Sequence, residues 1–253
     1  MFKYSSRFWL YAPTGLFLLL AAAAMIHWWI VAGAFEKKLA ALKGKEAVPG
    51  ITLNWDSVEV GGFPFRLEGN FANLRVQGAA AHGPFAWRSE KFALHALTYG
   101  RHQIVYEAAG RQELSWTAAS GNAHTVSFLP GSMRGSSLVD GKGLARFDLD
   151  LVNVGEKRVA IGRLQFHMRR DPDGSDLDLM VRADGLSALG VKIGGGLQLY
   201  TSLSQASALM PLLRGDNSWP GAIQNWRAQG GAAKPSQGKS AILSPDWFLS
   251  PLY

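Results

Sequence analysis

The sequence predicts a mainly β protein that is attached to a membrane by an N-terminal helix. Three observations carry this prediction: an uncharged N-terminal run, period-two alternation of apolar and polar residues beyond residue 50, and turn-forming Gly and Pro residues between the alternating runs. Alternation of this period places one face of a strand in apolar surroundings and the other in water. We therefore expect an antiparallel sheet with one apolar face, accompanied by one or two short helices.

The N-terminal run predicts a membrane-spanning helix. The stretch from Phe8 to Phe35 contains no Asp, Glu, Lys or Arg. Twenty helical residues cover about 30 Å, the thickness of the hydrocarbon core of a bilayer. Trp28 and Trp29 are expected at the membrane–water interface, where an indole ring can be buried while its N–H remains hydrated. Lys37 and Lys38 are expected on the aqueous side of this interface.

A cleaved signal peptide and a buried helix of a soluble protein are the alternatives to a retained anchor. Nothing downstream is apolar enough to bury the helix on all sides, which disfavours the second. A cleaved signal peptide would use Ala32-Gly33-Ala34 as its small-residue site, but signal cores are only about 7–15 residues long. The longer run favours a retained anchor. The positive-inside rule, applied to the Lys and Arg residues at the two ends of the span, slightly favours a cytoplasmic domain. A short tail, one span and a long domain is nevertheless the layout of a signal anchor, so we expect the domain outside the cytoplasm.

The chain divides into three segments. Residues 1–35 form a cytoplasmic tail and the anchor, residues 36–50 a juxtamembrane helix or stalk, and residues 51–253 the β-rich domain. Leucines and alanines in the second segment suit a short amphipathic helix, although a solvated stalk is the preferred interpretation. Pro49-Gly50 is expected to end it.

Alternation is clearest over three stretches of the β-rich domain, at 146–151, 164–169 and 176–182. Their apolar positions are Phe147, Leu149, Leu151, Leu164, Phe166, Met168, Leu177, Leu179 and Val181. The intervening Asp-Pro-Asp-Gly sequence predicts a hairpin. Other strands are predicted at Ile51–Val60, Phe63–Gly69, Phe71–Gln77, Phe92–Tyr99, Ile104–Glu107, Glu113–Thr117, Thr125–Leu129 and Ser240–Leu243. Helices are predicted at Leu197–Leu213 and Trp219–Gln229.

Composition excludes several classes of function. The chain has 253 residues, no cysteine and a formal net charge of +7. Disulfides, thiolate metal sites and cysteine nucleophiles are therefore excluded. A basic protein is attracted to anionic partners. Because its cations do not cluster with aromatic residues, we expect acidic lipid headgroups as the partner and no nucleic acid.

No motif predicts catalysis, a metal or a cofactor. The segment Asp171–Asp176 departs from the calcium-loop pattern, and no histidine pair has the spacing of a zinc enzyme. The chain has no Gly-x-Ser-x-Gly, and Gly194–Gly196 lacks the Lys-Ser/Thr of a phosphate loop. Asp148 and Asp150 share a strand face, which could suit acid–base work, but an acidic solvated sheet face is the simpler explanation. We expect a protein that is not an enzyme.

Two segments resemble a known family. Trp55–Gly69 contains Gly-Phe-Pro-Phe-Arg-Leu, and Trp226–Gly231 is a tryptophan followed by glycines. Both resemble the bacterial family called domain of unknown function 2125. The resemblance implies an inner-membrane span and a periplasmic β domain. It also implies an architecture similar to the AsmA-like group, in which the sheet curls into a groove or half-barrel with an apolar interior. Members of that group are implicated in lipid transport or outer-membrane homeostasis.

The leading functional hypothesis is a protein that binds or passes phospholipid or another envelope lipid along this groove. Phe63 and Phe65 are expected to point into the apolar interior at its membrane-proximal end. Together with Leu67 they are expected to contact lipid or to form part of an ordinary core. One alternative is an assembly factor that recruits an envelope protein by pairing at a sheet edge. An uncharacterised envelope enzyme is the third possibility.

Overall fold

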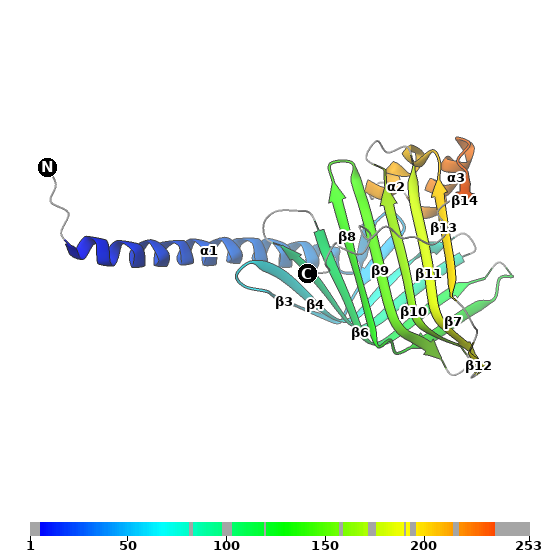
Figure 1. The fold of residues 1–253 in the computed structure, drawn as a ribbon, viewed down its shortest axis with the longest axis horizontal. Helices are drawn as coiled ribbons and strands as arrows, with labels where there is room; N and C mark the ends of the chain where they lie inside the picture. The colour runs from blue at the N-terminus through cyan, green and yellow to red at the C-terminus, as the bar shows by residue number, and fades with distance from the viewer. Residues whose placement is uncertain are drawn as a thin grey trace.

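A single long helix leads into one large antiparallel sheet in the computed structural model, as predicted (Figure 1). The structure describes residues 6–80, 83–97, 103–118, 120–156, 159–171, 176–189, 191–192, 196–214 and 218–235. The predicted strand at Ser240–Leu243 lies outside these residues.

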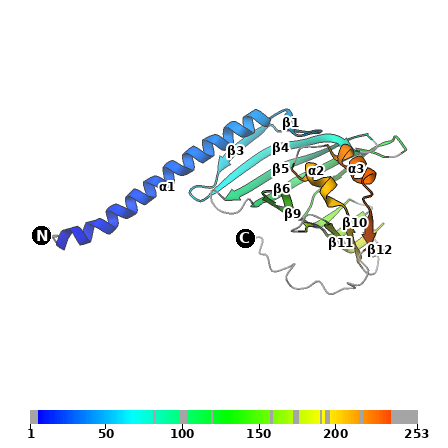
Figure 2. The same ribbon diagram turned by 90° about the horizontal axis from the view of Figure 1, so that it is seen from above.

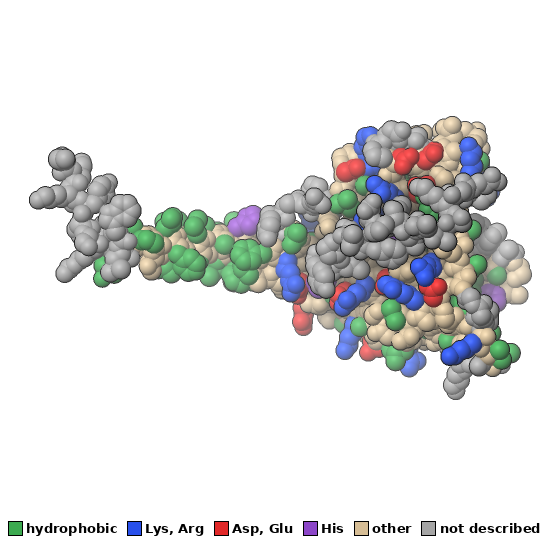
Figure 3. All heavy atoms as spheres, viewed as in Figure 1, with side chains coloured by type: hydrophobic (Ala, Val, Ile, Leu, Met, Phe, Trp, Pro, Cys, Tyr) green, Lys and Arg blue, Asp and Glu red, His purple; other side chains and the backbone are tan. Residues whose placement is uncertain are grey.

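Helix α1 (Ser6–Leu42) extends away from the β domain for most of its length (Figure 1). Its segment Tyr11–Leu42 is long and apolar enough to cross a membrane, with a mean hydropathy of 2.0 in its most apolar window. Hydrophobic side chains cover this part of the helix, whereas charged side chains of both signs are spread over the β domain (Figure 3). Large apolar side chains from Leu16 to Ile30 are exposed, which is the expected state of a helix that meets lipid rather than water.

The junction between anchor and sheet differs from the solvated stalk that we preferred. Helix α1 continues to Leu42, and strand β1 (Lys45–Val48) begins three residues later. Leu39 is buried against Trp55 and Phe71, so the end of the helix is packed onto the sheet. The leucines and alanines of this segment were compatible with an amphipathic helix, but only the position of the sheet shows which face that helix buries.

The described strands form one 14-stranded antiparallel sheet. After β1 they are β2 (Ile51–Asn54), β3 (Ser57–Gly61), β4 (Arg66–Ala80), β5 (Gly83–Leu97), β6 (Gln103–Thr117), β7 (Ala123–Phe128), β8 (Ser132–Asp140), β9 (Gly143–Glu156), β10 (Val159–Arg170), β11 (Leu177–Ala188), β12 (Val191–Lys192), β13 (Leu197–Leu203) and β14 (Ala233–Pro235). The main path is β1-β2-β4-β5-β6-β8-β9-β10-β11-β13-β14, with β3 on β4, β7 on β6 and β12 on β11. The predicted hairpin is confirmed by the pairing of β10 with β11.

Strand boundaries differ from the prediction where the alternation is interrupted. Strand β6 is continuous, although we expected two strands separated by residues 108–112. A bulge shifts the pairing of β5 with β6 after Ser89, and Gly110 there has φ +73°. An extra residue reverses the alternation without ending the strand. Strand β4 likewise passes without a break through Asn73, whose φ is +52°.

The predicted helix at Leu197–Leu213 is wrong over its first half. Leu197–Leu203 is strand β13, paired with β11 so that Leu199 lies opposite Val181. Only the short helices η1 (Ala206–Leu209) and α2 (Met210–Arg214) follow the helical pattern. Pairing with a neighbouring strand outweighs a weak helical periodicity in this segment. The second predicted helix is confirmed as α3 (Trp219–Ala228).

The sheet curls, so that strands β4–β6 and strands β9–β11 lie at an angle to one another (Figures 1 and 2). Two buried clusters lie on its apolar side. In one, η1 and α3 cover Met168 and Leu177, and α3 also contacts β4 on the other part of the sheet. In the second, the end of α1 covers Phe71 and its neighbours. Within the part of the chain that the structure describes, the sheet does not close into a barrel.

Candidate functional site

The structure brings the nine apolar residues predicted on the alternating stretches to one face of β9–β11. Strand register aligns them in rows: Leu149 lies opposite Phe166, which lies opposite Val181. The other six residues are also aligned by strand pairing. Leu151 lies opposite Leu164, and Met168 lies between Phe147 and Leu179. Leu177 lies opposite Arg170. Side chains directly opposite each other on antiparallel strands share a face. We call this side of the sheet the inner apolar face.

The inner apolar face continues across β8, β6, β5 and β4. Strand pairing places the following residues on this face: Met133 of β8; Ala108, Tyr106 and Ile104 of β6; Phe92 and Leu94 of β5; and Leu67 and Phe71 of β4. Leu67 is buried on this face, as expected. The other aromatic and aliphatic members were not predicted as site residues. The alternation of β4 and β6 is interrupted at Asn73 and Gly110, which have positive φ, and the pairing of β6 with β5 shifts at Gly110.

Much of this face is only half-buried. Phe166, packed against one buried cluster, Phe92 and Leu94, packed against the other, and Leu149 all keep part of their surface exposed. On the edge strand β13, Leu197 and Leu199 are 59% and 55% exposed. Their neighbours in register on β11 are Ala183 and Val181. The apolar rows therefore run from the folded core to an exposed sheet edge.

Polar groups also lie on the inner apolar face, and those of Tyr106, Ser137 and Arg170 have partners. The Tyr106 hydroxyl lies 2.7 Å from Ser137 Oγ, and the ring stacks on Phe92. Burial raises the pKa of Tyr106, and the hydrogen bond with Ser137 only partly offsets this, so the phenol is neutral at physiological pH. At the other end of the face, buried Arg170 forms an ion pair with Asp140.

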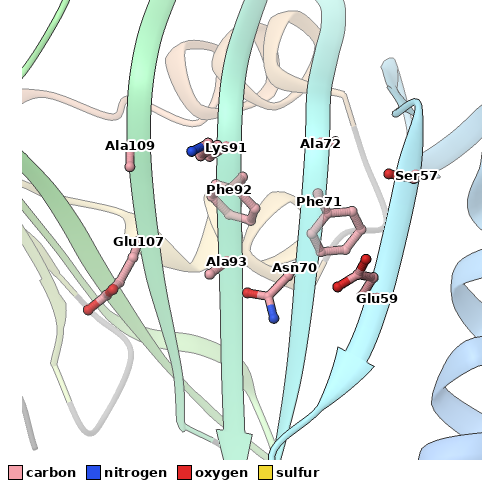
Figure 4. Close-up of a pocket in the computed structure, with 10 residues that line it drawn as sticks. All are labelled: Ser57, Glu59, Asn70, Phe71, Ala72, Lys91, Phe92, Ala93, Glu107 and Ala109. Carbon is pink, nitrogen blue, oxygen red and sulfur yellow. The ribbon is translucent and has the colours of Figure 1, made fainter.

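The outer face of the sheet is polar and rich in ion pairs. Arg163 donates two hydrogen bonds to Asp150, at 2.8 and 2.9 Å. A pocket of about 320 Å³ lies over β3–β6 on this face, where Figure 4 shows Glu59, Asn70 and Glu107 among its lining residues. It contains two carboxylates and one lysine but no histidine, so it offers no nucleophile–base pair of the serine–histidine kind.

Asp148 is the centre of a polar cluster on the same outer face. Its carboxylate lies 2.7 Å from His167 Nδ1 and 2.6 Å from Arg146 Nε, and it accepts a hydrogen bond from Ser136 Oγ at 3.3 Å. In a serine hydrolase the histidine lies between serine and carboxylate. Here the carboxylate lies between the other two, so His167 is not placed by this contact to take a proton from Ser136. Among the described residues, no group of three or more His, Asp or Glu side chains could hold a metal.

We expect Asp148 to contribute pH-dependent stability. Burial opposes its ionisation, but the hydrogen bond to His167 and the charge and hydrogen bond of Arg146 together hold the pKa of the Asp148 carboxyl below its usual range. The contribution is thus complete above the unfolded pKa of about 3.9 and is lost as pH falls towards the lower folded pKa. Asp148→Asn should lower the free energy of unfolding by about 1–3 kcal/mol at pH 7.

The test is urea unfolding of the full-length protein in detergent between pH 3 and pH 7. The difference between the unchanged protein and Asp148→Asn should shrink at the acidic end of this range. Asp150→Asn is the matched control, because its partner Arg163 is half-exposed and such pairs contribute about 0–1 kcal/mol. A difference for Asp148→Asn that stays constant with pH would contradict this explanation.

Phe63 and Phe65 do not point into the interior, contrary to the sequence-based expectation. They are 51% and 59% exposed on the β3–β4 connection. Gly62 has φ +94°, and a Cβ there would collide with the carbonyl oxygen of Arg66, so the tight turn requires glycine. The Arg66 N–H donates to the Gly62 carbonyl at 3.1 Å and closes the loop. This geometry directs the two aromatic side chains outward.

The predicted interface residues of α1 differ in their surroundings. Trp28 Nε1 donates a hydrogen bond to the Arg66 carbonyl at 3.0 Å, and the Trp28 ring meets the Phe63 ring edge-on at 5.5 Å between centroids. Trp29, on another side of the helix, is 70% exposed. Lys37 and Lys38 are also exposed.

The second sequence motif, Trp226–Gly231, makes stabilising contacts at the buried cluster of η1 and α3. Trp226 is buried, and its Nε1 donates to the Ser204 carbonyl at 2.7 Å. Gly231 turns back onto Trp226, with its N–H donating to the Trp226 carbonyl at 2.9 Å. A Cβ on Gly231 would collide with the indole ring. The tryptophan and the glycine are therefore needed together.

Comparison with known proteins places the chain in a family. The family model described as an uncharacterized protein conserved in bacteria (DUF2125) matches residues 28–237. The chain belongs to this family. The DUF2125 match includes both the Gly-Phe-Pro-Phe motif and the Trp226–Gly231 motif, as well as the last part of α1. No curated protein and no solved structure matches the chain. The similarity to the AsmA-like group stays a prediction.

Proposed function

We propose that this DUF2125 protein is a non-enzymatic envelope protein that binds or passes lipid along the inner apolar face. The observation that carries the proposal is the continuity of the apolar rows from β4 to the exposed edge at β13. Their side chains are half-buried over much of this path. An acyl chain laid along them would gain about 0.8 kcal/mol for each CH₂ group removed from water.

The membrane anchor supports lipid as the ligand. In this proposal α1 crosses the bacterial inner membrane and the sheet lies in the periplasm, so the apolar face is close to a source of lipid. The formal charge of +7 favours anionic headgroups. The curl of the sheet (Figure 2) and the apolar residues in register on its inner side support the groove-like architecture that the AsmA-like resemblance implies.

A second candidate function is recruitment of an envelope protein by strand addition. Within the described residues, β14 pairs only with Thr201–Leu203 of β13. The first half of β13 thus presents an edge next to exposed Leu197 and Leu199. Unpaired N–H and C=O groups on such an edge can pair with an added strand.

Site-specific photocrosslinking in bacterial membranes tests the two candidates together. A benzophenone amino acid in place of Phe166 or Leu94 samples the inner apolar face, and the same group in place of outer-face Arg134 is the matched control. In place of Leu199 it samples the edge. We expect lipid adducts, identified by mass spectrometry, at the two inner positions and none at Arg134.

The possible outcomes separate the hypotheses. Lipid adducts that are absent at Phe166 and Leu94, or equally abundant at Arg134, would refute binding at the inner apolar face. A protein adduct confined to Leu199, without lipid at the inner positions, would favour strand addition. Phe166 decides the result, because it packs against the cluster of η1 and α3, whereas Leu94 packs against the cluster that the end of α1 covers.

A further inference from the structure

We propose that the β3–β4 loop, residues 62–66, inserts its aromatic side chains into the same bilayer that α1 crosses. The proposal assigns Phe63 and Phe65 a membrane surface as their partner. It rests on α1 as a membrane span and does not depend on lipid binding by the inner apolar face. Three observations support it: the exposure of the loop, its attachment to Trp28, and the position of Trp28 along the helix.

The loop is built to present apolar side chains to its surroundings. Gly62 closes a tight turn that places Phe63 and Phe65 on the outside. Leu97, opposite Arg66 at the same end of the sheet, is 53% exposed as well. Exposed aromatic and aliphatic residues at one end of a domain are typical of a contact with a membrane or with another protein. The attachment of the loop to α1 favours the membrane.

The loop is held against the membrane-spanning helix. The Trp28 indole donates its hydrogen bond to the Arg66 carbonyl, and its ring contacts Phe63. The bond satisfies a backbone acceptor that would be costly to place in a bilayer unpaired. The charge of the Arg66 side chain is paired with Glu68 at 2.6 Å. In Figure 1 the β3–β4 connection lies at the end of the sheet that faces along α1 towards the N-terminus.

The position of Trp28 sets the depth of the loop. Trp28 precedes Glu36, the first charged residue after the apolar run, by eight residues. At 1.5 Å per residue this separation is about 12 Å along the helix axis. The interfacial layer of a leaflet is roughly 5–8 Å thick. When Glu36 is in water, Trp28 and the attached Phe63 therefore reach the boundary of the hydrocarbon core.

Spin labelling tests this depth, and the absence of cysteine from the chain makes single-site labelling direct. The full-length variants Phe65→Cys and Leu97→Cys carry a nitroxide in vesicles of phosphatidylethanolamine and phosphatidylglycerol. Leu18→Cys, in the middle of the span, is the membrane control, and Gln224→Cys, exposed on α3, is the aqueous control. The readout is the collision rate of each label with oxygen, which concentrates in lipid, and with a water-soluble nickel complex.

We expect oxygen to dominate at Leu18 and Phe65, and the nickel complex to dominate at Gln224. Leu97 should resemble Phe65 more closely than Gln224, which keeps the test valid if Phe65→Cys folds poorly. Nickel-dominated collisions at Phe65 and Leu97, with oxygen dominant at Leu18, would overturn the loop proposal but leave the anchor intact. Shielding of both loop labels from both reagents would also overturn it, because a protein would then cover the loop. A nickel-accessible Leu18 label would refute the span itself.

Discussion

Replacing Trp226 with alanine is expected to lower the free energy of unfolding by about 3–5 kcal/mol, the range found for removal of a buried large aromatic side chain. Trp226 contributes to the buried cluster that attaches η1 and α3 to the sheet. The substitution also leaves the Ser204 carbonyl without its indole donor. We expect urea unfolding of the full-length protein in detergent to show a correspondingly lower midpoint.

Two further variants separate the causes of this loss. Trp226→Phe keeps an aromatic ring but lacks the N–H, so it should cost less than the alanine variant. Gly231→Ala keeps the indole but places a methyl group inside the space that the ring occupies. We expect it to be destabilising too, because the ring cannot move without breaking the bond to Ser204. A small effect of both Trp226→Ala and Gly231→Ala would contradict the structural role of the motif.

Replacing Phe71 with alanine is the second change with a large expected effect, again about 3–5 kcal/mol. Its ring lies 5.2 Å from the Trp55 ring and 6.0 Å from the Phe92 ring, between centroids. Leu39 of α1 belongs to the same buried cluster. The variant should therefore weaken both the sheet and the attachment of the helix to it.

Phe65→Ala is the matched control for this substitution, because it removes the same side chain from an exposed position in the β3–β4 loop. We expect its unfolding midpoint in detergent to change little. Limited proteolysis near Leu42 should become faster in Phe71→Ala if the end of α1 is released. Equal destabilisation by the two variants would show that Phe71 is not part of a buried core in solution.

The sequence alone was sufficient for the features that depend on local pattern. An uncharged run long enough to span a bilayer predicts α1, because length and apolarity are properties of the segment itself. Strict alternation predicts strands β9–β11 and the face that Leu149, Phe166 and Val181 share, because successive side chains of a strand point to opposite sides. Turn residues predict the β10–β11 hairpin in the same way.

Other features depend on partners that are distant in the chain. Leu197–Leu203 is a strand because β11 offers it a pairing edge, although its own pattern allowed a helix. Strand β6 passes through Gly110 because β5 continues on the other side of the bulge. Leu39 is buried because the sheet lies beside it.

The orientation of the Phe63 and Phe65 side chains is another feature that the sequence did not predict. Local sequence shows two aromatic residues around a proline. The turn that Gly62 and Arg66 close leaves both side chains exposed, and Phe63 lies against Trp28 of α1. The period of alternation in a strand and the length of an apolar helix are set by neighbouring residues, so the sequence alone predicts them. Pairing edges, buried faces and the orientation of a loop are set by contacts between remote segments, whose energies compete with local preference and here outweigh it.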